Sequence, residues 1–232
     1  MFQWNWKEFL INPDLVADVQ QLQAMLENTQ VSEAEDRWVW LPDSSREFSV
    51  KAARLLIRAN VDISDRYIMD WCNWIPAKVN IHLWRTELGK IPTKVTLKNR
   101  NVLLDDPVCP LCGSEEETVD HLFIGCHVAS VVWNGISVWC KIPNIFAFTV
   151  RDLLGIFKEL TVSDRKKEAV QGIIMIACWN IWRARNNFVF ANKPVKIDKI
   201  ISEVKALGHF WFSNRSKYKD IEWGDWCSFV NM

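Results

Sequence analysis

The sequence predicts a mainly α-helical fold: an irregular helical domain with a small N-terminal β-hairpin and a loop that resembles a Cys-Cys-His-Cys zinc knuckle. Three observations lead to this prediction. Apolar residues recur at helical spacing along most of the chain, strand-like alternation is confined to one short stretch, and three Cys and one His fall within eighteen positions. With 232 residues, of which 49% are hydrophobic, the chain is long and apolar enough to bury a core.

The N-terminal 65 residues contain a predicted helix, a predicted hairpin and a second helix. Asn12 is a suitable cap for the first helix and Pro13 suits its first turn. Its apolar face is formed by Leu15, Val19, Leu22, Met25 and Leu26. Between Arg37 and Val50 the apolar residues alternate on both sides of a Pro-Asp-Ser-Ser break, which predicts the hairpin. A helix is then expected through about Ala59.

Two further helices are expected between Tyr67 and Arg100, broken at Pro76 and again over residues 89–92. On the first of them Ile81, Trp84 and Leu88 share one face and are expected to be buried. Another face carries a stripe of positive or titratable side chains, and the following helix continues the positive charge. These residues are Lys78, His82, Arg85, Lys94, Lys98 and Arg100. The loop that follows is acidic, so its charges could equally match this basic stretch within the molecule.

Four helices are predicted in the C-terminal half. They run from Cys126 to Cys140, from Thr149 to about Leu160, from Ser163 to about Phe190, and from Ile197 to about Phe212. In the first of these, the predicted inward residues are Val128, Val131, Val132, Ile136 and Trp139. We therefore expect a leading segment of residues 1–65, a metal-binding domain of residues 66–140 and a helical region of residues 141–232.

The ligand pattern C-x2-C-x8-H-x4-C is formed by Cys109, Cys112, His121 and Cys126. Thiolate and imidazole are the ligands that Zn²⁺ prefers, at about 2.0–2.3 Å in tetrahedral geometry. Four protein ligands leave no open position, so we expect one structural Zn²⁺. Free Cys is often only a small core residue, which is the alternative interpretation. His127, next to Cys126, is an alternative fourth ligand.

Composition excludes several classes of protein. Lys and Arg equal Asp and Glu at 28 each, so any nucleic-acid footprint must be local. The fourteen Trp residues are expected mainly in the core, with base stacking as the alternative. An odd number of Cys, no signal peptide and no membrane span predict an intracellular protein, in the nucleus or the cytoplasm. Asp105 and Asp106 lack a polymerase's aromatic neighbour, so no catalytic residues and no enzyme activity are expected.

The chain from Trp71 to Trp133 resembles the zinc-binding domain that follows the polymerase in plant LINE-type, non-LTR retrotransposons. The resemblance rests on the Cys and His ligands together with the sequence around them. The other matching segments are Trp74-Ile75-Pro76-Ala77-Lys78-Val79, Leu83-Trp84-Arg85, Ile91-Pro92-Thr93, Leu97, Arg100, Pro110-Leu111, Gly113, Glu117-Thr118-Val119-Asp120, Leu122-Phe123, Ala129 and Val132-Trp133. The sequence departs from the family pattern at residues 80–82 and just after Cys126.

The resemblance implies a non-catalytic accessory module beside a reverse transcriptase, with RNA or single-stranded DNA and the polymerase core as expected partners and no membrane. Phosphate contacts are expected from Lys78, Arg85, Lys94, Lys98 and Arg100. The alternative is a structural or protein-interaction remnant of a retroelement, in which zinc only stabilises the fold.

Overall fold

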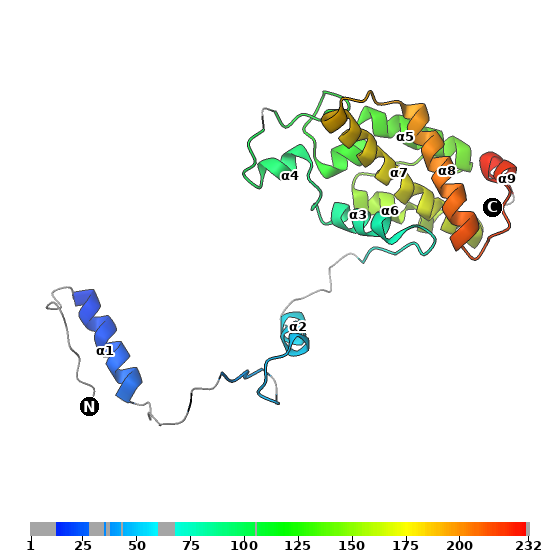
Figure 1. Cartoon of the computed structure of the whole chain (residues 1–232). Coiled ribbons are helices and arrows are strands. Elements are labelled where there is room, and N and C mark those ends of the chain that lie inside the picture. Colours follow the sequence, from blue (N-terminus) through cyan, green and yellow to red (C-terminus); the bar gives the residue numbers. More distant parts are fainter. Residues whose placement is uncertain are drawn as a thin grey trace. The chain divides into compact units, whose positions relative to one another are not determined.

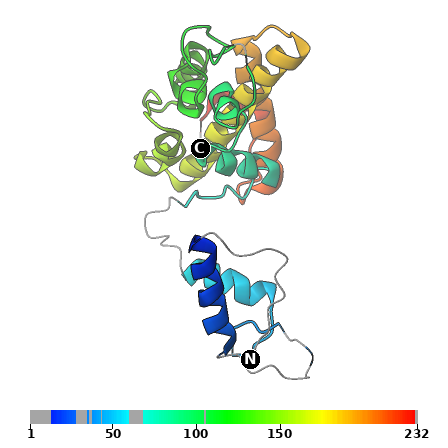
Figure 2. The same ribbon diagram turned by 90° about the vertical axis from the view of Figure 1, so that its left-hand side faces the viewer.

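The computed structural model describes residues 13–27, 35, 38–42, 44–59, 68–104 and 106–230. It divides into two compact units, Met1–Asp65 and Arg66–Met232 (Figures 1 and 2). Within the described residues all regular elements are helices, which confirms the predicted mainly α-helical class. No helix in this described part combines the length and apolar character that a membrane span requires. The division into three domains stays a prediction, and residues 68–140 and 141–230 share one core.

The first unit contains α1 (Pro13–Glu27) and α2 (Val50–Ala59). Both helices were expected, although the proposed cap Asn12 lies outside the described residues. Their apolar side chains are largely exposed: Leu22 and Leu55 are 44% and 56% accessible. Here the sequence pattern specifies amphipathic helices whose apolar faces are not covered by other described residues of this unit.

The predicted N-terminal β-hairpin is wrong. None of the described residues between 38 and 49 belongs to a strand, and only one backbone hydrogen bond crosses the turn, from Trp40 N–H to the Arg46 carbonyl at 3.0 Å. Arg46 has a φ of 57°, so the chain reverses there instead of continuing as a strand. Pro42 cannot donate a ladder hydrogen bond, and a two-stranded hairpin is marginal in water without a covering layer. The segment is therefore a turn, held by an edge-to-face contact of Trp40 with Phe48.

The second unit is built around α7 (Asp164–Ala191), which runs through its middle (Figure 1). The other elements in this unit are α3 (Ala77–Glu87), α4 (Lys94–Lys98), the π-helical turn η1 (His121–Gly125), α5 (His127–Cys140), α6 (Val150–Glu159), α8 (Ile197–Arg215) and α9 (Trp223–Ser228). Helices α3, α5, α6 and α8 all contact α7. The centre of α7 from Ile173 to Ile181 is buried nearly all round, as its apolar composition predicts.

Two predicted helix starts are confirmed in detail. Thr149 accepts the Asp152 N–H, and Asp152 accepts the Thr149 N–H, which completes a capping box at the start of α6. Ser163 accepts the Lys166 N–H at the start of α7. These starts are predictable because each cap satisfies backbone N–H groups within three residues of itself.

A close contact between α7 and the segment before α3 fixes the core. Trp74 is fully buried, and its indole N–H donates to the Glu168 carbonyl at 3.0 Å. Its ring lies over Gly172, where an added Cβ would come within 2.0 Å of the ring. A glycine on α7 is therefore needed to let this Trp enter the core.

The predicted buried face of α3 is wrong. Ile81, Trp84 and Leu88 are 43%, 47% and 45% exposed. The buried face is formed instead by Val79, Asn80, His82, Leu83 and Thr86. Asn80 closes a pair of hydrogen bonds with the Cys72 backbone at 3.0 Å each, which pulls this face inward. Similarly, Val131 of α5 was expected in the core but is 36% exposed.

Candidate metal centre

The first two Cys ligands are held by a tight turn. Val108 and Glu116 form an isolated antiparallel bridge, and the Cys109 N–H donates to the Glu115 carbonyl at 2.7 Å. Gly113 closes the turn by donating its N–H to the Cys109 carbonyl at 2.9 Å, with a φ of 67°. Glycine adopts this left-handed conformation without steric penalty. The turn brings the sulfurs of Cys109 and Cys112 to the same side.

The other two ligands lie at the two ends of η1. His121 begins this single π-helical turn, and Cys126 follows it as the residue before α5. The Cys126 N–H donates to the His121 carbonyl at 2.6 Å, which closes the turn. A π-turn places residues five apart on one side, so the five-residue spacing of His121 and Cys126 directs both side chains toward the first Cys pair.

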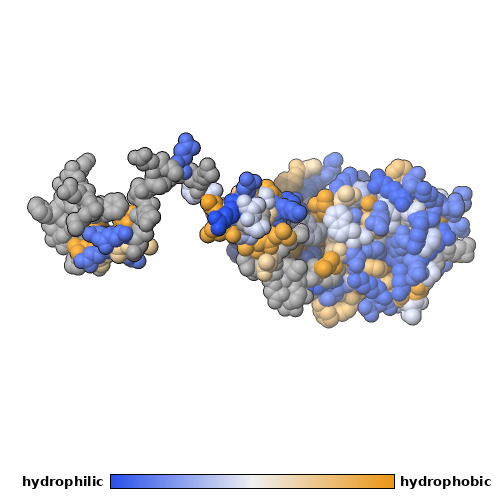
Figure 3. Space-filling model, turned by 90° about the horizontal axis from the view of Figure 1, so that it is seen from below, coloured by the Kyte–Doolittle hydropathy of each residue, from blue (hydrophilic) through white to orange (hydrophobic). Residues whose placement is uncertain are grey.

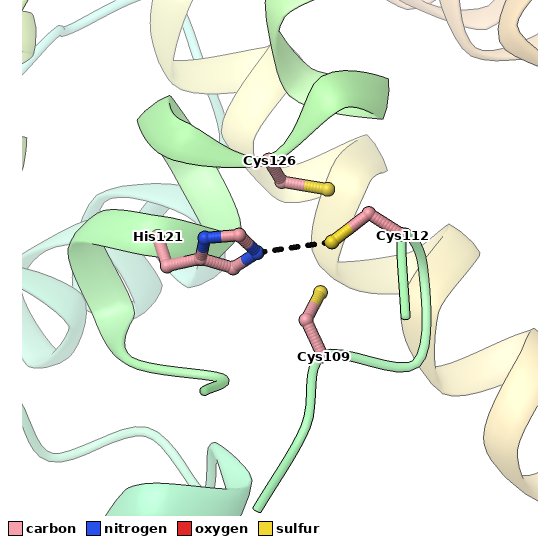
Figure 4. A group of neighbouring side chains, drawn as sticks. All are labelled: Cys109, Cys112, His121 and Cys126. Atoms are coloured by element: carbon pink, nitrogen blue, oxygen red, sulfur yellow. Dashed lines mark hydrogen bonds between the residues drawn. The ribbon is translucent and has the colours of Figure 1, made fainter. Parts of the chain in front are cut away.

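All four ligand atoms converge, as Figure 4 shows. They lie within 4.8 Å of one another, and the His121 Nε2 is 3.2 Å from the Cys112 Sγ. Four such ligands around Zn²⁺ would be separated by about 3.5–3.8 Å, given metal–ligand bonds of 2.0–2.3 Å at tetrahedral corners. None of the three Cys residues forms a disulfide. The donor set and its spacing therefore fit one metal ion, with no corner left for a reactive water.

His121 is oriented by a second hydrogen bond. Its Nδ1 lies 3.1 Å from the Glu115 carboxylate, while its backbone N–H donates to the Thr118 hydroxyl at 3.0 Å. With the Nδ1 proton held by Glu115, the Nε2 lone pair faces the three sulfurs. Carboxylate–histidine pairs of this kind fix the tautomer of a metal ligand. The sequence places Glu115 in an acidic loop but gives no signal of this role.

The thiols are electrostatically unequal. A hydrogen bond between Cys109 and Cys126 lowers the pKa of Cys126 and raises the pKa of Cys109, and burial raises the Cys109 pKa further. The Val128 and Ala129 amides at the start of α5 also lower the Cys126 pKa. Cys126 is therefore the most readily deprotonated member of that pair, as expected for a thiol at a helix N-terminus. The alternative ligand His127 is exposed and is not part of the cluster.

A buried ion pair joins the metal loop to α7. Arg185 donates from Nε and Nη2 to the two oxygens of Glu117, each at 2.7 Å. The third hydrogen bond to this carboxylate comes from the Lys94 backbone N–H, also at 2.7 Å. The two side chains are 3% and 0% exposed. Sequence reasoning missed Arg185, because its partner lies 68 residues away in the chain.

The five residues predicted to contact phosphates differ in their exposure and pairing, and their role stays a prediction. Lys78 and Arg85 are exposed on α3, and Lys98 and Arg100 are exposed near the end of α4. Lys94 is only 20% exposed and pairs with Asp106 at 3.0 Å. Arg100 donates to the Lys90 carbonyl at 3.3 Å. Part of the positive charge is therefore matched within the molecule, as the alternative interpretation of the acidic loop predicts.

These features define a helical domain with a closed site for one metal ion. Residues 48–133, just over a third of the chain, match the sequence model of the family described as zinc-binding in reverse transcriptase. The match contains all four ligands and supports a reverse-transcriptase zinc-binding domain in this region, of a class that is accessory and not catalytic. No match was found among curated proteins or among solved structures.

Proposed function

We propose that this chain is a non-catalytic zinc-binding accessory module of a retrotransposon reverse transcriptase, which assists binding of RNA or single-stranded DNA during target-primed reverse transcription. The observation that carries the proposal is the convergence of Cys109, Cys112, His121 and Cys126 within the segment that matches the family. The resemblance of the surrounding sequence supports a plant LINE-type, non-LTR element acting in the nucleus or cytoplasm.

The exposed face of α3 favours a single-stranded ligand. It carries Lys78 and Arg85, which lie two turns apart on one stripe of the helix, and the half-exposed Trp84, which precedes Arg85 in the chain. Proteins that bind single strands combine cations that follow the phosphates with aromatic side chains on which bases stack. The Lys78 ammonium also lies 5.8 Å from the centre of the Trp179 ring. The face thus offers both phosphate and base contacts.

The test is a metal analysis combined with oligonucleotide titrations. The purified chain should contain one equivalent of Zn²⁺. Because Lys94 is paired with Asp106, four cations remain for phosphates, so log K for a single strand should fall with log salt at a slope of about −0.7 × 4, or about −2.8.

Single substitutions locate the binding face. Trp84→Ala should weaken single-strand binding by about 1–3 kcal/mol without changing the salt slope, whereas Arg85→Ala should reduce the slope by about 0.7. Trp223→Ala is the matched control, since Trp223 is 48% exposed against 47% for Trp84 but lies on α9. An unchanged affinity for Trp84→Ala would reject this face as the binding site.

The second candidate function is a structural or protein-interaction remnant of a retroelement. The internal pairing of Lys94 with Asp106 and of Arg185 with Glu117 favours it, because charge used within the fold is not available to phosphates. It predicts zinc-dependent folding with no measurable oligonucleotide affinity at low salt. Docking to a reverse transcriptase core in a pull-down, without RNA or DNA, would support this candidate.

A further inference from the structure

The segment between α5 and α6 presents two phenylalanines to solvent. Burial alternates along it as along a strand: Ile145 and Ala147 are 7% and 6% exposed, whereas Phe146 and Phe148 are 71% and 78% exposed. The two exposed rings contact each other edge to face, with centroids 5.0 Å apart. Two adjacent exposed aromatics on one element form an apolar patch that the described fold does not cover.

These rings border a groove of about 780 Å³. Its apolar wall is formed by Ile124 of η1 and Val131 of α5, together with Phe146 and Phe148. The volume falls within the usual range of about 300–1,000 Å³ for binding pockets. The unexpected exposure of Val131 is explained by its position in this groove. On the face of the second unit that Figure 3 shows, hydrophilic and hydrophobic residues are intermixed.

The groove is negatively charged, which favours a positively charged ligand. Glu115 and Asp120 line it, and no Lys or Arg does so among the described residues. Glu115 contacts His121, and Asp120 accepts the Val150 N–H at 2.8 Å, so both carboxylates are held in place. Phosphates would be repelled from such a surface, whereas Lys or Arg would be attracted. An apolar peptide with flanking positive charge complements the groove, and a nucleic acid does not.

The backbone groups in the middle of the segment between α5 and α6 are not paired within the described part of the fold. The Ile145 N–H donates to the Ser137 hydroxyl at 2.9 Å and the Thr149 N–H to Asp152 at 2.9 Å, so both ends are fixed. Within the described structure, Phe146 and Ala147 form no backbone hydrogen bond. An extended peptide can add to such a free edge by main-chain hydrogen bonds, while its side chains fill adjacent pockets.

We propose that this groove binds an extended segment of a partner protein, which carries apolar residues flanked by Lys or Arg and pairs as an added strand along the edge that presents the Phe146 backbone. The proposal is independent of the nucleic-acid function proposed above. It uses different residues, a different charge and a different class of ligand.

The experiment is a fluorescence anisotropy titration of the zinc-loaded full chain with labelled seven-residue peptides. The probe has two valines separated by a serine and flanked by pairs of lysines; its counterpart has glutamates in place of the lysines. The lysine peptide should bind saturably, and the glutamate peptide should bind about tenfold or more weakly. Equal binding of the two peptides, or no saturable binding up to about 1 mM, overturns the proposal.

Variants place the binding in the groove. Phe146→Ser/Phe148→Ser should weaken binding of the lysine peptide about tenfold or more, because it removes both aromatic contacts. Phe190→Ser/Phe210→Ser is the matched control, since these rings are 79% and 62% exposed elsewhere. Asp120→Asn keeps the acceptor for the Val150 N–H but removes the charge, so it should weaken binding and reduce its salt dependence. Unchanged binding in the first variant overturns the proposal.

Two further arms test the mode of binding and the class of ligand. N-methylation of alternate peptide residues blocks one edge of an added strand, so one of the two methylated isomers should bind and the other should not. Equal behaviour of the isomers rejects strand pairing. A single-stranded RNA oligonucleotide whose affinity falls in Phe146→Ser/Phe148→Ser, while the lysine peptide does not bind, would identify the groove as a base-stacking site and overturn the proposal.

Discussion

Replacing Arg185 by Met should destabilise the second unit far more than an ordinary charge deletion. The substitution leaves the Glu117 carboxylate fully buried, with only the Lys94 N–H as a hydrogen-bond partner. Breaking a buried ion pair in this way costs about 3–5 kcal/mol, because the remaining charge is desolvated and uncompensated. In the double variant Arg185→Met/Glu117→Gln, the neutral amide still accepts the Lys94 N–H. Most of the lost stability should therefore return.

The assay is urea unfolding of the zinc-loaded chain, followed by circular dichroism. Lys199→Met is the control, because Lys199 is 71% exposed and 3.8 Å from Glu203, and exposed pairs contribute about 0–1 kcal/mol. The same variants should be titrated with Co²⁺, whose absorption reports tetrahedral thiolate ligation. Since Glu117 lies between the two ligand pairs, Arg185→Met should weaken Co²⁺ binding, whereas Lys199→Met should not. A loss below about 1 kcal/mol for Arg185→Met would refute this account of the pair.

Three other predictions follow from particular contacts. Gly172→Ala should destabilise by about 1–3 kcal/mol through overlap with Trp74, whereas Gly155→Ala, with nothing within 4 Å of its added Cβ, should be neutral or stabilising in thermal melts. Burial and then Arg85 lower the His82 pKa to about 4, so the unfolded state binds more protons between about pH 6.5 and 4. Stability should fall as the pH falls through that window, by up to about 3 kcal/mol, and His82→Phe should lose this component in urea titrations. Cys126→Ser should abolish stoichiometric metal binding and chelation should unfold the metal loop of the wild type, whereas Cys227→Ser, outside the cluster, should retain one equivalent in metal analysis.

Structural features that depend on neighbouring residues in the chain agree with the sequence. The caps Thr149 and Ser163 and the left-handed Gly113 act within three or four residues, so the sequence contains all the partners that matter. The failed hairpin shows the limit of such signals. Alternation between Arg37 and Val50 is local, but a strand pair also needs a covering layer, which the described residues of that unit do not provide.

The choice of buried faces was less predictable. On α3 the sequence favoured burial of Ile81, Trp84 and Leu88 and assigned His82 to a stripe of positive or titratable side chains. The structure buries the face with Val79 and Leu83, and the Cys72 backbone satisfies the side chain of Asn80, which lies beside Val79. A buried polar residue with a specific partner can therefore outweigh greater apolar area, since an unpaired polar group is costly wherever it is buried.

By itself, the sequence determined the four ligands and most of the helices, because ligand spacing and helix caps depend on short stretches of chain. Tertiary structure alone decided which basic residues remain unpaired and can contact phosphates. It also decided that Arg185 pairs with Glu117, 68 residues away in the chain. In the same way, it decided that η1, α5 and residues 144–148 form a groove beside the metal loop. These features depend on contacts between distant segments, and an ion pair or a groove of that kind leaves no periodic pattern in the chain.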